Sequence, residues 1–239
     1  MTKLSVNINK IATIRNARGG DLPSVTEAAV KIQEFGAHGI TIHPRPDERH
    51  ITRKDVYDLK PLVYTEFNIE GNPHRPFIDM VLEVKPEQVT LVPDAENAIT
   101  SNAGWDCEKN LDFLKSVIAE FKNAGIRTSI FLDPNPEMVK FAAETGTDRI
   151  ELYTEAYAKN YAADKEKAIL PYIKTAEGAS KYNLGINAGH DLSLENLKFF
   201  AENIPNLLEV SIGHALISEA LYMGMENTVQ AYLKRLMVW

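Results

Sequence analysis

The sequence predicts an α/β fold, a single-domain (β/α)8 TIM barrel that occupies residues 1–239. Eight short apolar runs along the chain have the character of buried strands, and segments with apolar residues at every third or fourth position lie between them. Such regular alternation of strand and helix favours a parallel sheet. The chain has 239 residues, which is close to the roughly 250 of one barrel and leaves no room for a second domain.

The predicted strands are rich in Val, Ile, Leu and Phe, and nearly every one ends on a residue that can carry chemistry or hold an anion. In chain order they cover 4–9, 39–43, 67–70, 88–93, 127–133, 149–154, 184–190 and 208–214. In a (β/α)8 barrel, the loops after the carboxyl ends of the strands build the active site. We therefore expect one pocket to collect Asn7, His43, Glu70, Asp133, Glu151, His190 and His214.

Side-chain alternation predicts that the barrel interior is polar near this mouth. Residues two apart on a strand share a direction. The polar pairs are Asn7 with Asn9, Thr41 with His43, Asn68 with Glu70, and Glu151 with Tyr153. A wholly packed barrel prefers Val, Ile and Leu at such positions, so the pairs indicate a polar top layer.

Between the strands, helices are predicted over 24–35, 110–125 and 193–204 from their apolar periodicity. Gly follows several of these segments, as expected at helix ends, and Asp21, Pro134 to Pro136 and Ser193 are candidate helix starts. Two segments, 93–106 and 154–164, are predicted to be irregular loops at the mouth, where a lid could exclude water.

Composition limits the possible partners. A net charge of −7 and a pI near 5.4 argue against a general electrostatic hold on nucleic acid or anionic lipid. The N-terminal segment has no signal-peptide pattern, and no apolar stretch approaches the ~20 residues of a membrane span. Cys107 is the single cysteine, so no intrachain disulfide can form. We expect a soluble, cytoplasmic protein with no membrane or nucleic-acid partner.

The strand-end acids and histidines predict acid–base chemistry. Glu70 could be a buried carboxylate that only holds a neighbouring loop, but we favour a general base whose pKa is raised by desolvation. For Glu151 two roles stay open: orienting a histidine or stabilising positive charge. His43 and His190 each end a strand, and imidazoles suit repeated proton transfers near neutral pH. His50 is a further candidate.

Two kinds of segment predict binding of small phosphorylated ligands. NAGHD (187–191) and SIGHA (211–215) follow the last two strands, where barrels commonly bind phosphate through backbone N–H groups and a helix N-terminus. Basic residues also cluster after the first two strands, at Arg15, Arg18, Arg45, Arg49, His50 and Arg53. A small phosphate ester can reach such clusters in a barrel mouth.

We expect no metal and no other cofactor. His and carboxylate side chains can bind divalent metals, but strand one offers Asn7, Asn9 and Lys10 rather than paired histidines. A Schiff-base aldolase needs a desolvated lysine at a strand end, and Lys10 lies just past its strand.

Six segments carry a resemblance to a known family: VNINKIATIRNARGG, GITIHPRPDERHIT, FNIE, RIELYT, GINAGHDL and VSIGHALISEAL. They are similar, in order and over essentially the whole chain, to those of the pyridoxine 5'-phosphate synthase family of vitamin B6 biosynthesis. The resemblance implies a cofactor-free condensation of 3-amino-2-oxopropyl phosphate with 1-deoxy-D-xylulose 5-phosphate, which gives pyridoxine 5'-phosphate, inorganic phosphate and water. It also implies a homo-octamer.

The resemblance assigns roles to individual residues. His43 matches the first proton acceptor of the family, Glu70 the second, His190 the proton donor, and Glu151 the carboxylate that stabilises the transition state. The positions that contact the aminoketone phosphate are matched by Asn7, Arg18, Asp191, Gly213 and His214. Those that hold the deoxyxylulose phosphate are matched by Arg45, His50 and Thr100.

The chain departs from the family pattern at three places. Asn9 and Lys10 stand where many members have Asp and His, Asp191 stands where they have Gly, and Tyr153 where some have His. Lys10 keeps a positive charge near the phosphate, whereas Asn9 loses a carboxylate. The Asp191 side chain would repel a phosphate, so we expect it to turn away while its backbone N–H stays available.

Two alternative functions have distinct expectations. Another phosphosugar isomerase or aldolase on this barrel would share the phosphate loops but would leave the cluster of Arg45 and His50 unexplained. An inactive barrel that serves as a scaffold would not need His43, Glu70 and His190 together.

Overall fold

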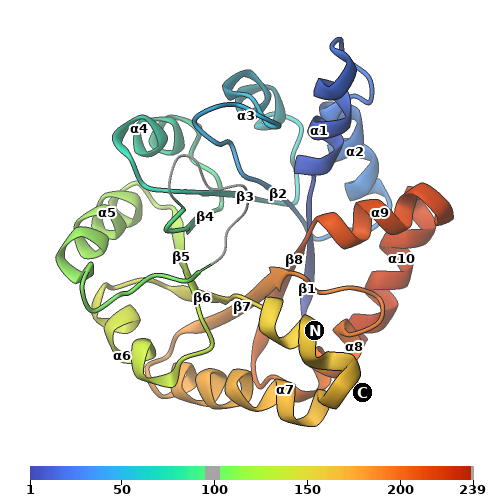
Figure 1. Ribbon diagram of the computed structural model, residues 1–239. Helices are drawn as coiled ribbons and strands as arrows, with labels where there is room; N and C mark the ends of the chain where they lie inside the picture. The colour runs from blue at the N-terminus through green and yellow to red at the C-terminus, as the bar shows by residue number, and fades with distance from the viewer. Residues whose placement is uncertain (95–102, 238–239) are drawn as a thin grey trace.

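The computed structural model describes residues 1–94 and 103–237, and it confirms the predicted (β/α)8 barrel. The parallel strands form a closed barrel in chain order, in which β1 pairs with both β2 and β8 (Figure 1). The strands are β1 Lys3–Asn7, β2 Gly39–Ile42, β3 Glu66–Gly71, β4 Gln88–Leu91, β5 Arg127–Leu132, β6 Arg149–Leu152, β7 Gly185–His190 and β8 Leu207–Ile212.

Helices surround the barrel, and two of them follow β1 and two follow β8 (Figure 1). They are α1 Asn9–Arg18, α2 Val25–Glu34, α3 Arg53–Leu59, α4 Arg75–Val84, α5 Leu111–Asn123, α6 Pro136–Glu144, α7 Glu155–Lys181, α8 Leu197–Asn203, α9 His214–Met223 and α10 Met225–Leu236. The helices predicted over 24–35 and 110–125 correspond to α2 and α5. None of the helices in the described ranges is long and apolar enough to cross a membrane.

Several predicted boundaries are wrong, and each has a local reason. The first strand ends at Asn7, because Asn9 already opens α1. The last strand ends at Ile212, because Gly213 is the N-cap of α9. The helix predicted from Ser193 begins at Leu197, after a turn in which the Asn196 side chain accepts a hydrogen bond from the Ser193 N–H (2.9 Å).

The segment 154–164 is helical, which contradicts the predicted loop. It forms the start of α7, and four of its residues are Ala, the strongest helix former. The helix is interrupted at Asp164, where φ is −162° and ψ is 88°. The Asp164 side chain accepts a hydrogen bond from the Lys167 N–H (3.0 Å) and so starts the second part of the helix.

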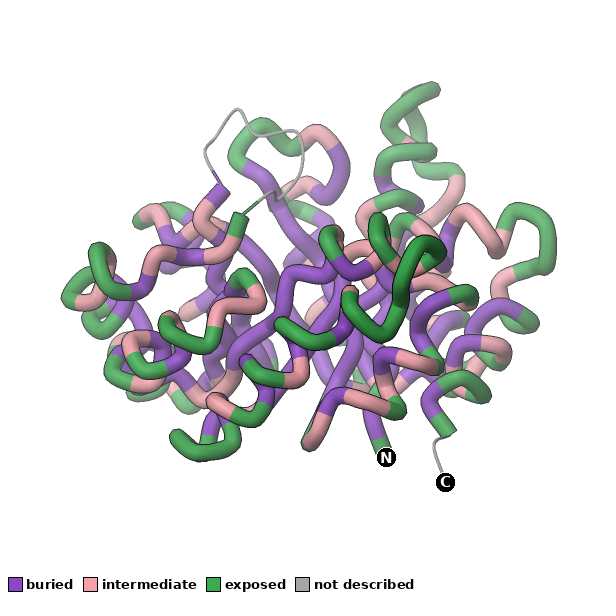
Figure 2. Tube along the Cα trace, turned by 60° about the horizontal axis from the view of Figure 1, so that its bottom comes forward, coloured by how far each residue is buried: buried purple, intermediate pink, exposed green. Residues whose placement is uncertain are grey.

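Alternation divides the strands into an apolar outer face and a polar inner face. The outer rows include Leu4, Val6, Ile40, Ile42, Phe67 and Ile69, all fully buried against the helices (Figure 2). Inside the barrel, Ser5 and Thr41 hydroxyls lie 2.7 Å apart, and Thr90 donates to Asn68 at 3.1 Å. The predicted polar interior is therefore built from hydrogen-bonded side chains, and its inner rows end at the mouth.

Candidate active site

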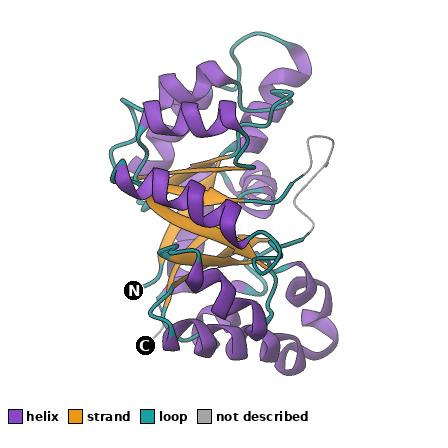
Figure 3. Cartoon of the chain, turned by 90° about the vertical axis from the view of Figure 1, so that its left-hand side faces the viewer, coloured by secondary structure: helices purple, strands orange, loops and turns teal. Residues whose placement is uncertain are grey.

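A cavity of about 570 Å³ opens at the carboxyl ends of the strands. The N-terminus, which leads into β1, lies at the other end of the barrel (Figure 3). The structure brings most of the predicted site residues to the lining of this cavity: Asn7, Asn9, Lys10, His43, Arg45, His50, Glu70, Glu151, His190, Asp191, Gly213 and His214. Residues far apart in the sequence thus share one pocket, as the barrel plan predicts.

Glu70 lies at the inner face of β3, where two neighbouring side chains donate to its carboxylate. Asn7 Nδ2 donates to Oε2 (3.3 Å) and Ser211 Oγ donates to Oε1 (3.4 Å). The residue is 9% exposed. Burial raises the pKa of Glu70 from 4.5 to about 7, although the positive charge of His190 opposes the shift. Near neutral pH, this carboxyl group can therefore both take up and release a proton.

His43 follows β2, and its Nδ1 lies 3.8 Å from Glu70 Oε2. Burial, aided by the positive charge of Arg45, holds the pKa of His43 well below 6.5. The imidazole is therefore neutral at neutral pH. A neutral imidazole beside the substrate space is a proton acceptor.

His190 ends β7 and has the opposite tendency. Burial alone would lower its pKa, but the hydrogen bond and the negative charge of Asp191 outweigh burial and raise the pKa above 6.5. The negative charges of Glu70 and Glu155 act in the same direction. These contacts favour the protonated imidazole, which can donate a proton.

Glu151 lies on the inner face of β6, deep in the cavity, and is 3% exposed. Burial raises its pKa well above 4.5, and the charges of Glu70 and Glu209 add to the shift. Its Oε2 atom is buried and has no hydrogen-bond partner among the residues that the structure describes. Burial therefore favours the neutral carboxylic acid at Glu151.

The residues after β1 join the mouth to the loop after β2. Asn9 Oδ1 accepts a hydrogen bond from the His43 N–H (3.0 Å), and Asn7 Oδ1 accepts one from the Asn9 N–H (3.1 Å). Lys10 is exposed and lines the cavity close enough for its charge to act on His50. Asn9 thus fixes the backbone that carries His43.

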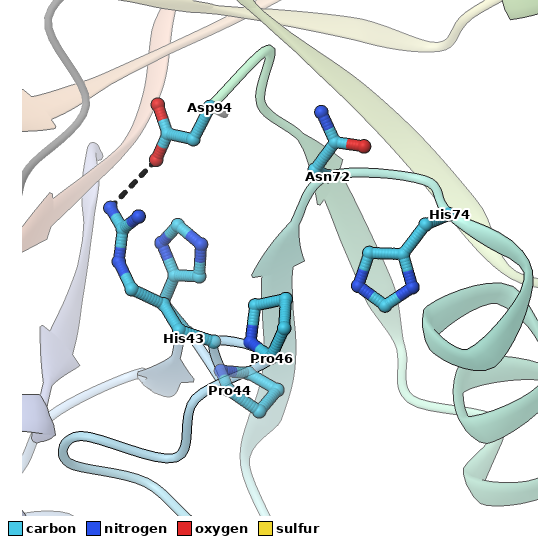
Figure 4. Close-up of a pocket in the computed structure, with 7 residues that line it drawn as sticks. His43, Pro44, Pro46, Asn72, His74 and Asp94 are labelled. Atoms are coloured by element: carbon cyan, nitrogen blue, oxygen red, sulfur yellow. Dashed lines mark hydrogen bonds and ion pairs between the residues drawn. The ribbon is translucent and has the colours of Figure 1, made fainter. Parts of the chain in front are cut away.

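An ion pair holds Arg45 and a hydrogen bond holds His50 in the loop after β2. Arg45 NH2 lies 2.7 Å from Asp94 Oδ2, and both side chains are buried (Figure 4). His50 Nδ1 accepts a hydrogen bond from the Ile51 N–H (2.9 Å). Burial, with the charges of Arg45 and Lys10, lowers the pKa of His50 to about 4.

Arg15 does not face the cavity, which corrects the expectation that it forms an anion site with Arg18. Its guanidinium makes two hydrogen bonds to the Asp55 carboxylate (2.5 and 2.8 Å) and one to the His50 carbonyl oxygen (3.2 Å). Arg15 therefore fastens the β2 loop to α1 and α3, and its function is structural.

A second, smaller cavity of about 160 Å³ adjoins the mouth behind Arg45. It shares His43 and Arg45 with the larger cavity and is closed by Asn72 and by His74 at the start of α4 (Figure 4). His74 caps this helix by accepting a hydrogen bond from the Phe77 N–H (3.2 Å).

Three predicted residues are not part of the described cavity. Arg18 is exposed at the end of α1, and Asp133 is exposed after β5. Thr100 lies outside the described residues, so its role stays a prediction. The Asp191 backbone N–H, which was expected to be available to phosphate, donates instead to the Gly189 carbonyl oxygen (3.0 Å) and to Thr154 Oγ1 (3.4 Å).

Sequence reasoning missed Ser211, which donates a hydrogen bond to Glu70, and Asp94, which forms an ion pair with Arg45. A usable signal existed for Ser211, since it lies two residues before Gly213 and shares the inner row of β8 with Glu209. No sequence pattern indicates that Asp94 pairs with Arg45, because the two residues come from different loops.

The chain is similar to known proteins over nearly its whole length. Residues 4–238 match the family model described as pyridoxal phosphate biosynthesis protein PdxJ. A protein of Christiangramia forsetii named pyridoxine 5'-phosphate synthase is 66% identical over 236 residues, which are 99% of this chain and 100% of that protein. One of the same name from Bacteroides thetaiotaomicron is 62% identical and covers 97% of this chain and 98% of its own length.

Solved structures with a similar fold share far less sequence. A mutant tryptophan synthase alpha-subunit from Pyrococcus furiosus has a TM-score of 0.64 and 14% identity, with 98% of each chain covered. A phosphoribosyl anthranilate isomerase has a TM-score of 0.61 and 12% identity, with 99% of this chain and 98% of the other covered. At such low identity these structures support the barrel fold alone.

Proposed function

The chain belongs to the PdxJ family of pyridoxal phosphate biosynthesis proteins and is an enzyme of the pyridoxine 5'-phosphate synthase kind, and we propose that its barrel mouth carries out this reaction by acid–base catalysis. The reaction joins 3-amino-2-oxopropyl phosphate to 1-deoxy-D-xylulose 5-phosphate and releases inorganic phosphate and water. The observation that supports the mechanism best is the convergence of Glu70, His43, His190 and Glu151 on one cavity with pKa values displaced in opposite directions.

We assign the two proton acceptors to Glu70 and His43. The amine of one substrate must lose protons as it attacks the ketone of the other, and a carbon acid must be deprotonated before the ring closes. Glu70 has a pKa of about 7 and His43 is neutral, so both can accept protons at neutral pH. Their separation of 3.8 Å lets them serve the same reacting centre in successive steps.

The proton donor is His190, which protonates oxygen atoms that leave as water. Its raised pKa favours the charged form, whereas the lowered pKa of His43 favours the neutral form. Burial favours the neutral form of Glu151, and positive iminium charge that develops beside it lowers its pKa and favours the carboxylate. Glu151 therefore becomes negatively charged as the positive iminium charge forms.

Two phosphate groups are bound by different sides of the mouth. The turn at Gly213, with His214 at the first position of α9, presents a helix N-terminus to the aminoketone phosphate, and Asn7 lies beside this turn. Lys10, Arg45 and His50 line the side that we assign to the deoxyxylulose phosphate. Holding both substrates supplies the proximity that a bimolecular condensation otherwise lacks.

The test is to mix the two substrates with purified protein and follow pyridoxine 5'-phosphate by absorbance and inorganic phosphate by a coupled assay. Product that requires both substrates supports the proposal. Turnover of either phosphorylated substrate alone would favour an isomerase or aldolase, and no turnover with intact fold would favour a scaffold role.

We also propose a homo-oligomer, an octamer by family likeness, that acts in the cytoplasm. Apolar side chains that are largely exposed support association of subunits: Leu22 (78% exposed), Leu221 (70%) and Tyr222 (91%). Light scattering on the eluting protein gives the molar mass, and a monomeric mass would refute the oligomer.

A further inference from the structure

We propose that Asp191 is a positioning residue for His190, in that its carboxylate holds the imidazole by Nδ1 and keeps it charged for proton donation. His190 Nδ1 lies 2.6 Å from Asp191 Oδ2, and both side chains line the active-site cavity. The inference rests on the proposed function and adds a residue to it. A chain with Gly at this position, as in many relatives, lacks this carboxylate.

The backbone at His190 is what turns its side chain into the cavity. His190 pairs with Ile212 in register, and Ile212 belongs to the apolar row that faces the helices. Regular alternation would point His190 the same way. Its φ of +64° breaks this alternation, and the Asp191 N–H donates to the Gly189 carbonyl oxygen (3.0 Å), which makes a γ-turn of the rarer, more strained kind.

A strained turn persists only if its surroundings hold it. Thr154 Oγ1 donates to the Gly189 carbonyl oxygen, and Asn196 Nδ2 donates to the Asp191 carbonyl oxygen (3.3 Å). The hydrogen bond between the side chains of His190 and Asp191 closes the turn from the cavity side. This contact orients the ring with Nδ1 toward the carboxylate, and we assign proton exchange with substrate to Nε2.

The charged groups around His190 come from several elements. Glu70 on β3 and Glu155 at the start of α7 favour the imidazolium, whereas a charge on His43 after β2 would disfavour it. The Tyr153 ring packs edge-on against the imidazole, with centroids 5.3 Å apart, and helps to bury it. Asp191 is the only carboxylate for which the structure gives a hydrogen bond to the ring in the described part of the chain.

The same contact explains how a carboxylate is tolerated in a phosphate-binding loop. An isolated Asp191 carboxylate would repel a phosphate, but beside a protonated His190 the pair has no net charge. The side chain is also directed to the imidazole by the short hydrogen bond. The substitution of Gly by Asp therefore adds a partner for the acid without adding net negative charge to the site.

The experiment compares Asp191→Asn with the unmodified protein. The amide oxygen of Asn can still accept a hydrogen bond from Nδ1–H, so the ring keeps its orientation. The substitution removes the negative charge of Asp191, so the imidazolium loses the electrostatic stabilisation that this charge supplies. We expect kcat at alkaline pH to fall roughly tenfold or more, with KM values little changed, and the alkaline limb of the pH profile to move to lower pH. At acid pH, where His190 is protonated without help, the deficit should shrink.

The matched control is Glu195→Gln, which removes a carboxylate from an exposed position of the same loop. Its pH profile should match that of the unmodified enzyme. Asp191→Gly, which restores the residue of many relatives, should move the alkaline limb as Asp191→Asn does, and it serves if the Asn variant does not fold.

A second measurement reports on His190 without using activity. Diethyl pyrocarbonate reacts with the neutral imidazole of a histidine and not with the protonated form. The pH dependence of His190 modification, read by peptide mass spectrometry, therefore follows the titration of His190. The midpoint should move to lower pH in Asp191→Asn and not in Glu195→Gln. Unchanged midpoints together with an unchanged pH profile would overturn this inference alone, whereas absence of pyridoxine 5'-phosphate formation by the unmodified protein would overturn the proposed function.

Discussion

Replacing Glu70 by Gln tests the assignment of the general base, because the amide is nearly isosteric with the carboxyl group but cannot accept the proton. In the structure, Glu70 accepts hydrogen bonds from Asn7 Nδ2 (3.3 Å) and Ser211 Oγ (3.4 Å). The Gln side chain can keep one of these bonds through its oxygen. The substitution therefore changes proton transfer far more than it changes packing.

The expected loss of activity is large. Removing one general base costs roughly 10²- to 10⁴-fold in rate. The pH profile should change too, since burial raises the pKa of Glu70 to about 7. In the unmodified enzyme, kcat/KM should rise with pH through this value, and the rise should be absent from the residual activity of Glu70→Gln.

The same substitution should leave stability intact or raise it. A carboxyl group whose pKa rises from 4.5 in the unfolded chain to about 7 in the folded protein binds a proton more tightly when folded. Its contribution to stability is therefore full below pH 4.5 and falls as the pH rises to 7. A displacement of this size corresponds to about 3 kcal/mol. Gln avoids this cost but loses part of two long hydrogen bonds, so we expect a net gain of about 1–2 kcal/mol at pH 8 and none at pH 4.

Thermal unfolding at both pH values and steady-state kinetics across pH provide the assay. Glu195→Gln is the control, since Glu195 is an exposed carboxylate that does not line the cavity. Its turnover and its melting curve should match those of the unmodified enzyme. Near-normal turnover of Glu70→Gln would refute the assignment of the general base, and a melting curve unchanged at pH 8 would contradict the expected gain in stability.

Three further predictions follow from the mouth and its packing. Dialysis against a strong chelator should leave turnover unchanged, because we assign every step to side-chain acids and bases; activity that is lost and then restored by zinc or manganese would show that a metal takes part. Lys10→Ala should raise the KM for 1-deoxy-D-xylulose 5-phosphate more than the KM for the aminoketone, by a factor that shrinks at high salt because an exposed cation is screened. The control Lys174→Ala, which removes an exposed lysine of α7, should change neither KM. An equal rise of both KM values in Lys10→Ala would contradict the assignment of Lys10 to the deoxyxylulose phosphate. Gly189→Ala should lower the melting temperature by about 5–10 °C, because a Cβ atom there would overlap the Ser211 carbonyl oxygen. The control Gly178→Ala should be neutral or stabilising, because its Cβ atom would lie 3.7 Å from its nearest neighbour. Equal melting temperatures for the two variants would contradict the packing argument.

The sequence predicts those parts of the site that depend on regular strand geometry. Alternation places Asn7, His43, Glu70 and Glu151 on inner rows because their strands run without irregularity to the mouth. His190 also lies in the cavity, but for a reason that periodicity cannot supply. The left-handed backbone at His190 sets its direction, because regular pairing with Ile212 would point the side chain toward the helices.

Contacts between loops could not be predicted from the sequence. The RNARG segment suggests a basic anion site, but Arg15 pairs with Asp55, which is 40 residues away, and so holds the β2 loop. Charge in a sequence does not tell whether an arginine faces a ligand or a carboxylate of the protein. The helix over residues 155–164 was obscured for a different reason, because its kink at Asp164 interrupts the apolar periodicity.

The cavity has to attract two phosphate esters and also keep acid and base groups in different protonation states. Burial alone would favour the neutral form of all four groups that we assign to catalysis, since it raises the pKa of Glu70 and Glu151 and lowers that of His43 and His190. Neutral carboxyl groups do not repel anionic substrates, but a neutral His190 could not donate a proton readily. The Asp191 carboxylate restores charge to that one group, so an acid and its bases can coexist within a single buried pocket.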